Sequence, residues 1–470
     1  MTLTKRTKIL CTIGPASESP EIMRKLVNAG MDGIRINTAH GNLEQYKKII
    51  ENIKRISDDI PILIDIKGPE IRARVKHGIA IKEGDIIRVG FDPTFDIYMT
   101  KDFYDNIMVG NKVLFCNGII TTEVIKKNDR TRELELKSLT DGIIEDNKGV
   151  NIPNVKLEFP TLTENDKSIL SWCSKNDIDY VAMSFARSSH DIMKVREHLH
   201  NEIKIIAKIE NNEGLENINE IADAADGIMI ARGDLGAEIG IENIPVVQKK
   251  IIQACINSGD LCITATQMLE SMIYNPMPTR AEVTDVATAV LDGTDCVMLS
   301  GETAVGKYPV QAVKIMATIC NRMEKEIPKK TVITFTKSTQ AIRTISEAVT
   351  TAIPLLADQV NASKIVAFTR SGFTATMIAR FRYPADVFAV TSNRRFFRQL
   401  NLYFGIKPIL MNDANQTVPK TAEYLIKHKY ANPDETVIFS SGTYKYRSHH
   451  SNMIEVHNLG EICHDGKCSF

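Results

Sequence analysis

The feature that most restricts the possible folds is an alternation of strand and helix patterns that repeats eight times. Short runs rich in Ile, Val and Leu are each followed by an amphipathic segment of helical periodicity. The runs are residues 8–14, 33–39, 61–68, 179–186, 204–210, 226–232, 261–267 and 296–302. Such strands are buried on both faces, which indicates a parallel sheet covered by helices. Eight units without a Gly-rich dinucleotide-binding turn favour a closed (β/α)8 TIM barrel over a doubly wound open sheet.

Two regions do not follow this alternation. Residues 70–155 interrupt the third unit with short strand patterns and turn signals such as Asn117-Gly118, which predict a small inserted β-barrel. Because it follows the carboxyl end of a barrel strand, this insertion is expected to form a lid over the active site. After residue 330 a new α/β pattern predicts a five-stranded sheet. The predicted domains are therefore residues 1–69 with 156–330 (barrel), 70–155 (lid) and 331–470 (C-terminal α/β domain).

Composition limits the classes of partner. Lys plus Arg and Asp plus Glu number 58 each, so no global charge favours nucleic acid or an anionic membrane. No apolar run reaches the length of about 18 residues that a membrane span needs. The nine cysteines, mostly inside apolar runs, indicate reduced thiols in a cytoplasmic protein. Cys463 and Cys468 could bind a metal or form a disulfide, but a single pair without a second pair is a weak pattern.

Polar residues gather at the carboxyl ends of the predicted strands, where a barrel has its active site. A spacing of two places two side chains on the same side of a strand. The pairs are Arg35 and Asn37, Asp65 and Lys67, Lys208 and Glu210, Arg232 and Asp234, Thr264 and Thr266, and Ser300 and Glu302. Lys208 and Glu210 alone could be a structural ion pair within the core. Polar groups at six converging strand ends favour an active site instead.

The residue types at these ends indicate a metal and an anionic substrate. Glu210 and Asp234 end consecutive strands that should lie about 5 Å apart, so both carboxylates can reach one hard cation such as Mg²⁺. Arg35 and Lys208 add positive charge suited to a phosphate or a carboxylate. The glycines of the turn 232–236 let backbone N–H groups approach an anion.

The segment 301–308 nearly matches a nucleotide-binding phosphate loop. It lacks the final Ser or Thr that such a loop uses for magnesium, and it closes the predicted barrel. We therefore expect no phosphate loop there.

The chain resembles the pyruvate kinase family over nearly its whole length. The matching stretches are CTIGPAS (11–17), RINTAHG (35–41), DIKGPEIR (65–72), NKGVNIP (147–153), AKIENNEG (207–214), IMIARGDLG (228–236), TATQMLESM (264–272), PTRAEVTDVA (278–287) and MLSGETAVGKYP (298–309). Each stretch is short, but the set in this order is specific. The family fold of barrel, β lid and C-terminal α/β domain agrees with the independent prediction. The resemblance implies phosphoryl transfer from phosphoenolpyruvate to ADP, giving pyruvate and ATP, by a homotetramer.

The resemblance also implies roles for matching residues. Lys208 would stabilise the transferring phosphoryl group and the enolate oxygen, while Glu210 and Asp234 would hold Mg²⁺ or Mn²⁺. Arg35 would bind the substrate phosphate, and Thr266 would order a water relay that protonates the enolate. Substrate binding is assigned to Arg35, Lys208, Ala231, Gly233, Asp234 and Thr266, and nucleotide binding to Arg72, Lys148, Pro15 and His40.

Two further sites follow from the resemblance. Asn37, Asp65 and Ile66 match the family's potassium site, where Ala39 and Ile66 replace the usual Ser and Thr. Ala39 deletes one side-chain oxygen, which puts potassium binding in question, although Glu70 accompanies a potassium requirement in the family. The loop formed by Thr369, Arg370, Ser371, Gly372 and Thr374 resembles an effector-phosphate loop, and an ordinary capped strand-to-helix turn is the alternative. Lys445 and Arg447 could form a second phosphate clamp or a solvated loop.

Two other classes of function stay open at this point. A lyase or aldolase acting on pyruvate enolates would also place Glu and Asp at strand ends, but it would need neither Arg72 nor Lys148. A non-catalytic sensor of phosphorylated metabolites would have no reason to keep Lys208, Glu210, Asp234 and Thr266 together.

Overall fold

The computed structural model of the chain describes residues 5–116, 118–157, 159–200, 202–327, 344–442 and 451–465. Its centre is a closed barrel in the order β1-β17-β16-β15-β14-β13-β3-β2. The strands are β1 (Lys8–Thr12), β2 (Gly33–Asn37), β3 (Ile62–Ile66), β13 (Tyr180–Met183), β14 (Lys204–Ile209), β15 (Gly227–Ala231), β16 (Leu261–Ala265) and β17 (Cys296–Leu299). All neighbouring strands are parallel. The predicted barrel is confirmed, and the open sheet is wrong.

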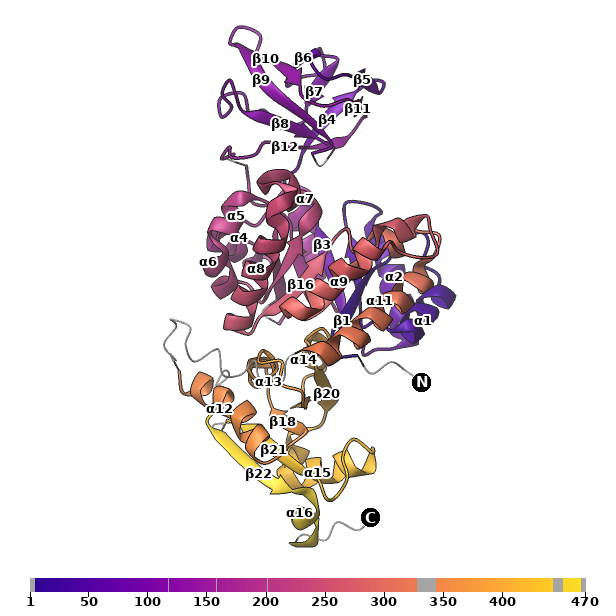
Figure 1. The fold of residues 1–470 in the computed structure, drawn as a ribbon, viewed down its shortest axis with the longest axis vertical. Coiled ribbons are helices and arrows are strands. Elements are labelled where there is room, and N and C mark those ends of the chain that lie inside the picture. The colour runs from indigo at the N-terminus through magenta and orange to yellow at the C-terminus, as the bar shows by residue number, and fades with distance from the viewer. Residues whose placement is uncertain are drawn as a thin grey trace.

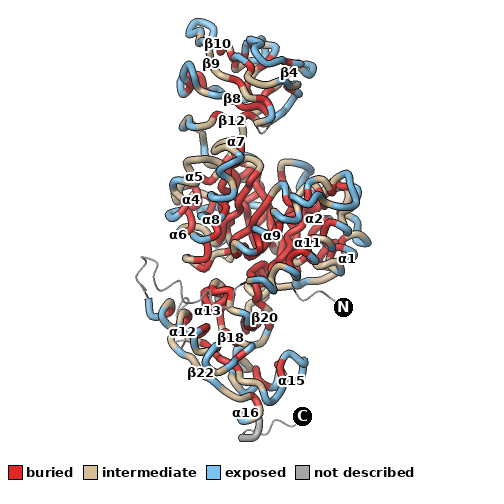
Figure 2. The backbone as a smooth tube through the Cα atoms, viewed as in Figure 1, coloured by how far each residue is buried: buried red, intermediate tan, exposed pale blue. Residues whose placement is uncertain are grey.

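Helices surround this barrel, as Figure 1 shows. They are α1 (Pro20–Ala29), α2 (Leu43–Ile56), α3 (Glu164–Ser174), α4 (Ser189–Arg196), α5 (Asn212–Glu216), α6 (Ile218–Ala224), α7 (Arg232–Ile239), α8 (Ile244–Ser258), α9 (Arg280–Asp292), α10 (Gly301–Ala304) and α11 (Pro309–Met323). Short 3-10 helices cover Ile241–Asn243, Glu270–Ile273 and Glu324–Glu326. Every residue of β1, β3, β15 and β16 is buried, because side chains pack both inside the barrel and against the helices. Figure 2 shows this buried centre in red.

The inserted lid follows β3 and stands beyond the carboxyl ends of the barrel strands (Figure 1). Its seven-stranded sheet has the order β6-β10-β9-β8-β12-β4-β7, and β5 pairs with β11. The strands are β4 (Ile71–Val75), β5 (Ile79–Ile81), β6 (Ile86–Val89), β7 (Ile97–Met99), β8 (Lys112–Phe115), β9 (Ile120–Asn128), β10 (Glu133–Ser138), β11 (Gly142–Ile144) and β12 (Lys148–Asn151). Alternate residues of β4 are buried, as expected for a sheet with one face on a core. Asn117, of the predicted hairpin turn, lies outside the described residues.

The C-terminal domain has a five-stranded sheet in the order β20-β19-β18-β21-β22. The strands are β18 (Lys364–Phe368), β19 (Asp386–Thr391), β20 (Ile406–Leu410), β21 (Thr436–Ser441) and β22 (Met453–Asn458), and only β22 is antiparallel. The accompanying helices are α12 (Ile345–Gln359), α13 (Phe373–Ala379), α14 (Arg394–Leu400), α15 (Val418–Lys427) and α16 (Leu459–Asp465), with a 3-10 turn at Asp413–Asn415. The predicted α/β domain is confirmed, while the domain limits stay a prediction.

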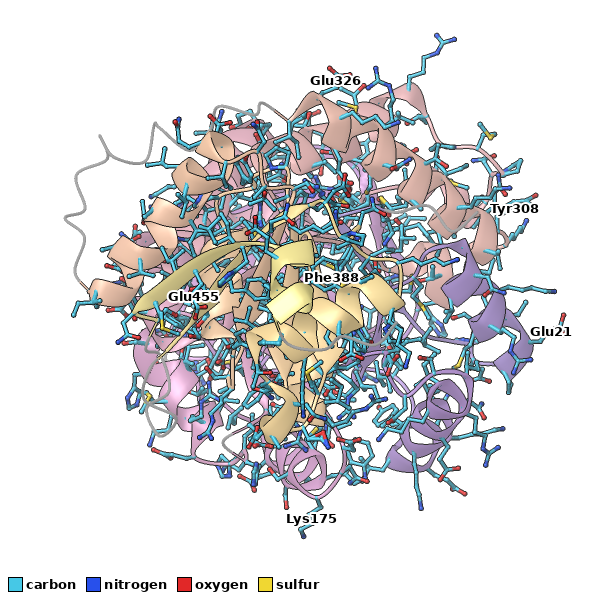
Figure 3. All side chains as sticks on the ribbon, turned by 90° about the horizontal axis from the view of Figure 1, so that it is seen from below. Glu21, Lys175, Tyr308, Glu326, Phe388 and Glu455 are labelled. Carbon is cyan, nitrogen blue, oxygen red and sulfur yellow. The ribbon has the colours of Figure 1, made fainter. Side chains whose placement is uncertain are left out.

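Buried ion pairs attach the C-terminal domain to the end of the barrel opposite the lid. Arg398 Nε lies 2.9 Å from Asp179 Oδ1, immediately before β13. Arg382 Nη1 lies 2.8 Å from Asp295 Oδ1, immediately before β17. Seen from below, the C-terminal domain with Phe388 overlies the middle of the barrel, and Glu21, Lys175 and Tyr308 lie at its rim (Figure 3). The lid end of the barrel therefore remains available for a substrate site.

Candidate active site

Lys208 lies at the carboxyl end of β14 within a buried cluster of charges. Its ammonium is 2.8 Å from Glu210 Oε1, 3.2 Å from Asp65 Oδ1 and 2.7 Å from Ser184 Oγ. Burial alone would lower the pKa of Lys208, but the carboxylates of Asp65 and Glu210 outweigh burial and raise the pKa above its ordinary value. The amine of Lys208 is therefore protonated. It contacts acceptors at the carboxyl ends of three strands, namely Asp65 of β3, Ser184 after β13 and Glu210 after β14.

Arg35 of β2 places a second cation next to the first. Its Nε and Nη2 lie 2.8 and 2.7 Å from Asp65 Oδ2, and its Nη1 donates to Thr12 Oγ1 at 2.9 Å. Burial opposes ionisation of Asp65, but Lys208 and Arg35 together hold its pKa below the ordinary value. Asp65 is thus shared by two cations, and an arginine beside a lysine provides donors that suit an anionic substrate such as a phosphate.

The predicted metal carboxylates come from different elements. Glu210 directly follows β14, and its Oε2 accepts a hydrogen bond from the Phe185 N–H at 2.8 Å. Asp234 is not at a strand end: β15 stops at Ala231 and α7 begins at Arg232. The expectation of a strand pair at Arg232 and Asp234 is wrong, because the chain turns into a helix there.

The two carboxylates suit a hard divalent cation. Burial raises the pKa of Glu210 and of Asp234, and the negative charge of Asp234 raises that of Glu210 further. A cation bound between the two carboxylates would stabilise their ionised forms against both burial and mutual repulsion. Within the described part of the chain no three His, Cys, Asp or Glu side chains group as metal ligands. Two carboxylates with remaining positions for water and substrate oxygens are the donor set that Mg²⁺ or Mn²⁺ commonly uses.

Thr266 lies beside the first turn of α7. Its backbone is left-handed, with φ of 64°. Its Oγ1 accepts a hydrogen bond from the Gly233 N–H at 2.9 Å and donates to the Ala265 carbonyl at 2.7 Å. Ala231, Gly233 and Thr266, predicted separately from the sequence, are thus neighbours at the start of a helix, where the first backbone N–H groups have no partner within the helix.

Other strand-end residues do not join this group. Thr264 is buried and bonds the Thr294 hydroxyl at 3.0 Å. Glu302 belongs to α10 and accepts the Ser300 N–H at 2.7 Å and the Leu269 N–H at 3.0 Å. The prediction that these positions face the site is wrong, because their hydrogen bonds hold neighbouring loops. The segment 301–308 forms α10 and a turn after β17, the last barrel strand.

The lid contributes two basic residues across a cavity of about 620 Å³ between lid and barrel. Arg72 of β4 and Lys148 of β12 are on paired strands and line this cavity together with Asp234 and Glu238. Arg72 Nε lies 2.7 Å from Glu70 Oε2, and Lys148 Nζ lies 2.9 Å from Glu145 Oε2. Both cations are therefore held by carboxylates at the lid edge.

Pro15 and His40 are exposed in the loops after β1 and β2, and among the described residues they are not part of the cavity lining. The structure does not bring these two predicted nucleotide residues onto the cavity of Arg72 and Lys148. Their assignment stays a prediction.

Three residues near the site were missed from the sequence. Ser184 and Phe185 follow β13, where Ser184 bonds Lys208 and the Phe185 N–H bonds Glu210. A serine directly after an apolar strand was a usable signal, but it had no polar partner two residues away. Glu238 of α7 accepts from Asn151 Nδ2 of the lid at 3.2 Å, and burial raises its pKa to about 7.

The predicted potassium residues lie on paired positions of two adjacent strands, since Asn37 of β2 faces Asp65 of β3. Asn37 Oδ1 accepts the Ala39 N–H at 3.1 Å, and the Ile66 carbonyl accepts the Ser184 hydroxyl at 2.8 Å. Asp65 is already paired with both cations of the site. The oxygens of Asn37, Asp65 and Ile66 thus come from adjacent strands, but each already accepts a hydrogen bond or an ion pair from the protein.

The predicted effector loop connects β18 to α13. Thr369 Oγ1 accepts the Gly372 N–H at 2.9 Å, and the hydroxyls of Thr374 and Ser451 are 2.6 Å apart. Lys445, Arg447 and Cys468 lie outside the described residues, as does the side chain of Cys463. Seven other cysteines are free thiols: Cys11, Cys116, Cys173, Cys255, Cys262, Cys296 and Cys320. In the described part of the chain we find no helix with the length and apolarity to cross a membrane.

Comparison with known proteins gives consistent matches along the chain. The profile for "Pyruvate kinase, barrel domain" matches residues 4–313, and that for "Pyruvate kinase, alpha/beta domain" matches residues 347–457. Pyruvate kinases from Sporosarcina psychrophila and Geobacillus stearothermophilus are 37% and 38% identical, covering 98% of this chain and 82% of each relative. One from Bacillus licheniformis is 42% identical over 86% of this chain and 71% of its own length. The crystal structure of a pyruvate kinase from Cryptosporidium parvum is 32% identical, with a TM-score of 0.90 over 97% of this chain and 96% of the other.

Proposed function

This chain belongs to the pyruvate kinase family, and from that premise we propose which of its residues transfer the phosphoryl group of phosphoenolpyruvate to ADP, giving pyruvate and ATP. The observation that supports the assignment best is the buried group of Arg35, Lys208, Glu210 and Asp65 at the barrel mouth, beneath a lid that presents Arg72 and Lys148.

Arg35 and Lys208 bind the phosphate of phosphoenolpyruvate and stabilise the charge that develops during transfer. Phosphoryl transfer requires positioning and charge neutralisation more than covalent catalysis. Glu210 and Asp234 would hold Mg²⁺ or Mn²⁺, which when bound supplies further neutralisation of phosphate charge. Arg72 and Lys148 bind the phosphates of ADP from the lid, and Pro15 and His40 contact the nucleotide at the rim.

The carboxylate of the substrate is bound at the start of α7. The N–H groups there, between Ala231 and Asp234, provide donors without a side-chain charge. Thr266 Oγ1, which touches the Gly233 N–H, orders the water that delivers a proton to the enolate carbon. A threonine hydroxyl is too weak an acid to donate that proton directly at neutral pH.

A coupled assay of pyruvate formation tests the assignment against the two alternatives. Pyruvate should appear from phosphoenolpyruvate only when ADP and Mg²⁺ or Mn²⁺ are both present, with one ATP for each pyruvate. Pyruvate release that does not depend on ADP would favour a lyase. Substrate binding without turnover would favour a sensor.

The potassium site is proposed at Asn37, Asp65 and Ile66, weakened by the missing hydroxyl at Ala39. Potassium should then activate only slightly over a matched tetramethylammonium salt. Ala39→Ser should increase the activation, because it restores an oxygen ligand next to Asn37. Strong activation of the unchanged protein would overturn this proposal.

We further propose a homotetramer with a cytoplasmic location, and a phosphorylated effector at the loop Thr369–Thr374. Exposed apolar side chains on the barrel support assembly, since Ile241, Val246 and Tyr274 are 80%, 73% and 69% exposed. Light scattering measures the oligomeric state, with a monomer as the contrary result. Rates at low phosphoenolpyruvate with a series of sugar phosphates and nucleoside monophosphates test the effector. Arg370→Ala should abolish any response.

A further inference from the structure

Arg232 is a buried cation that the proposed reaction does not use. Only 6% of its surface is exposed, although it directly precedes Gly233 in the first turn of α7. Its guanidinium donates to the Ala265 carbonyl at the end of β16, and among the described residues Arg232 is not in the lining of the cavity of Arg72 and Lys148. The other arginine of the site, Arg35, instead faces the shared carboxylate Asp65.

The guanidinium of Arg232 gathers the backbone carbonyls of three consecutive residues. Its Nη2 donates to the Thr266 carbonyl at 2.7 Å and to the Gln267 carbonyl at 3.2 Å. Its Nε lies 3.3 Å from the Ala265 carbonyl. On the other side, Nη1 donates to Asp285 Oδ1 at 2.7 Å and to Gln248 Oε1 at 3.2 Å. Side chains of α8 and α9 thus fix the Arg232 guanidinium, whose other N–H groups donate to the turn of residues 265–267.

That turn has an unfavourable backbone. Thr266 and Gln267 have φ of 64° and 53°, two left-handed non-glycine residues in succession. A β-branched residue rarely adopts this conformation, because its Cβ crowds the following carbonyl. Strained backbone of this kind persists where surrounding contacts over-determine it. The hydrogen bonds from Arg232 to the carbonyls of residues 265–267 are contacts of this kind.

The strained turn directs the Thr266 hydroxyl. In this conformation Oγ1 meets the Gly233 N–H at 2.9 Å, next to the proposed carboxylate site. We propose that Arg232 is a positioning residue that holds the Thr266–Gln267 turn so that the Thr266 hydroxyl faces the substrate enolate. The proposal rests on the role of Thr266 in protonation given above. Arg232 itself touches no substrate.

A double-mutant cycle with Arg232→Lys and Thr266→Ala tests this coupling. Lysine keeps the charge but cannot serve several carbonyls in one plane. We expect Arg232→Lys to lower kcat by about 10- to 100-fold with the KM for ADP unchanged. The exchange of pyruvate methyl protons with D₂O, followed by NMR, should fall by the same factor. In the Thr266→Ala background, Arg232→Lys should change both rates by less than about twofold.

Arg382→Lys is the matched control. Arg382 is similarly buried and donates to the Gly293 carbonyl at 2.6 Å and to Asp295, at the opposite end of the barrel. Its replacement should lower the unfolding temperature and leave kcat and proton exchange unaltered. Asp285→Asn provides a second variant that keeps Arg232 in place. Asp285→Asn should lower kcat and proton exchange by a smaller factor than Arg232→Lys. In the Thr266→Ala background it should change neither rate.

The outcomes distinguish a failure of the proposed role of Arg232 from a failure of the proposed role of Thr266. Multiplicative losses in the double variant would overturn the positioning role of Arg232, even if Thr266→Ala is impaired. Normal kcat and normal proton exchange in Thr266→Ala would instead refute the role of Thr266, and the role of Arg232 with it. An equal loss of kcat in Arg382→Lys would assign the effect of Arg232 to general stability and would also overturn the proposal.

Discussion

Replacing Lys208 by Met tests the centre of the proposed site. Methionine has a similar length but removes the charge that lies 2.8 Å from Glu210 and 3.2 Å from Asp65. Cations that stabilise a transferring phosphoryl group contribute about 10³- to 10⁵-fold to turnover. We expect kcat to fall by that order, while ADP still binds through Arg72 and Lys148.

The same change should tighten the binding of a divalent cation. A unit charge and a double charge about 5 Å apart, in a medium with an effective dielectric constant near 20, repel each other by roughly 7 kcal/mol. Part of this gain is offset, because Lys208 lowers the pKa of Glu210 and its loss favours the protonated carboxyl. At about pH 8, where the carboxyl is more fully ionised, we expect Mn²⁺ to bind about tenfold tighter.

The assays are coupled turnover, calorimetric titration with ADP and electron paramagnetic resonance titration with Mn²⁺. Lys204→Met is the control, because Lys204 is a partly buried lysine at the other end of β14 and donates to the Tyr403 hydroxyl at 3.1 Å. That variant should lose stability but keep its turnover. Turnover of Lys208→Met within tenfold of the unchanged protein, together with unaltered Mn²⁺ affinity, would contradict the proposed role of Lys208.

Three further variants test single contacts. Ser184→Ala removes the hydroxyl that accepts from Lys208 at 2.7 Å, and should lower kcat by about tenfold without changing the KM for ADP in the coupled assay; an unchanged kcat would contradict it. Arg187→Ala removes donors to the Leu157 and Phe159 carbonyls, at 3.3 and 3.4 Å, in the linker that returns from the lid. Its KM for ADP should rise several-fold with less effect on kcat, and an unaltered KM would count against a role in placing the lid. Burial raises the pKa of Asp260 to about 7 from 3.8, so the folded state binds this proton more tightly and stability falls as pH rises between those values. Asp260→Asn should therefore stabilise the fold at about pH 8, by at most about 4 kcal/mol, and not at about pH 4; equal unfolding temperature shifts at both pH values would exclude this cause.

Much of the fold and part of the site could be predicted from residue patterns. Apolar runs separated by amphipathic segments require a covered parallel sheet, and eight of them favour closure. Lys208 was identifiable because it interrupts the run 205–209 in a strand that is otherwise apolar. Glu210, two positions later, had to lie on the same side of the chain.

The Arg-Gly-Asp turn was misread because its pattern does not distinguish a strand end from a helix start. Arg232 and Asp234 have the spacing of two that a strand would use, but the chain enters α7 at Arg232. Helical geometry turns successive side chains by about 100°, so Arg232 faces β16 while Asp234 faces the cavity. Packing against α8 and α9 decides where β15 ends and α7 begins, and that packing cannot be predicted from the five residues of the turn alone.

Residue patterns alone predicted the barrel, the lid insertion and the shared side of Lys208 and Glu210, since periodicity is a local property. The chain order of the eight runs already makes β13 a neighbour of β3 and β14 in the predicted barrel. The tertiary structure was needed to show which polar atoms meet there, since Ser184 accepts from Lys208 and Asp65 pairs with two cations at once. Such sharing of buried charges and hydrogen bonds depends on contacts between residues far apart in the chain, because only the three-dimensional fold brings these residues together.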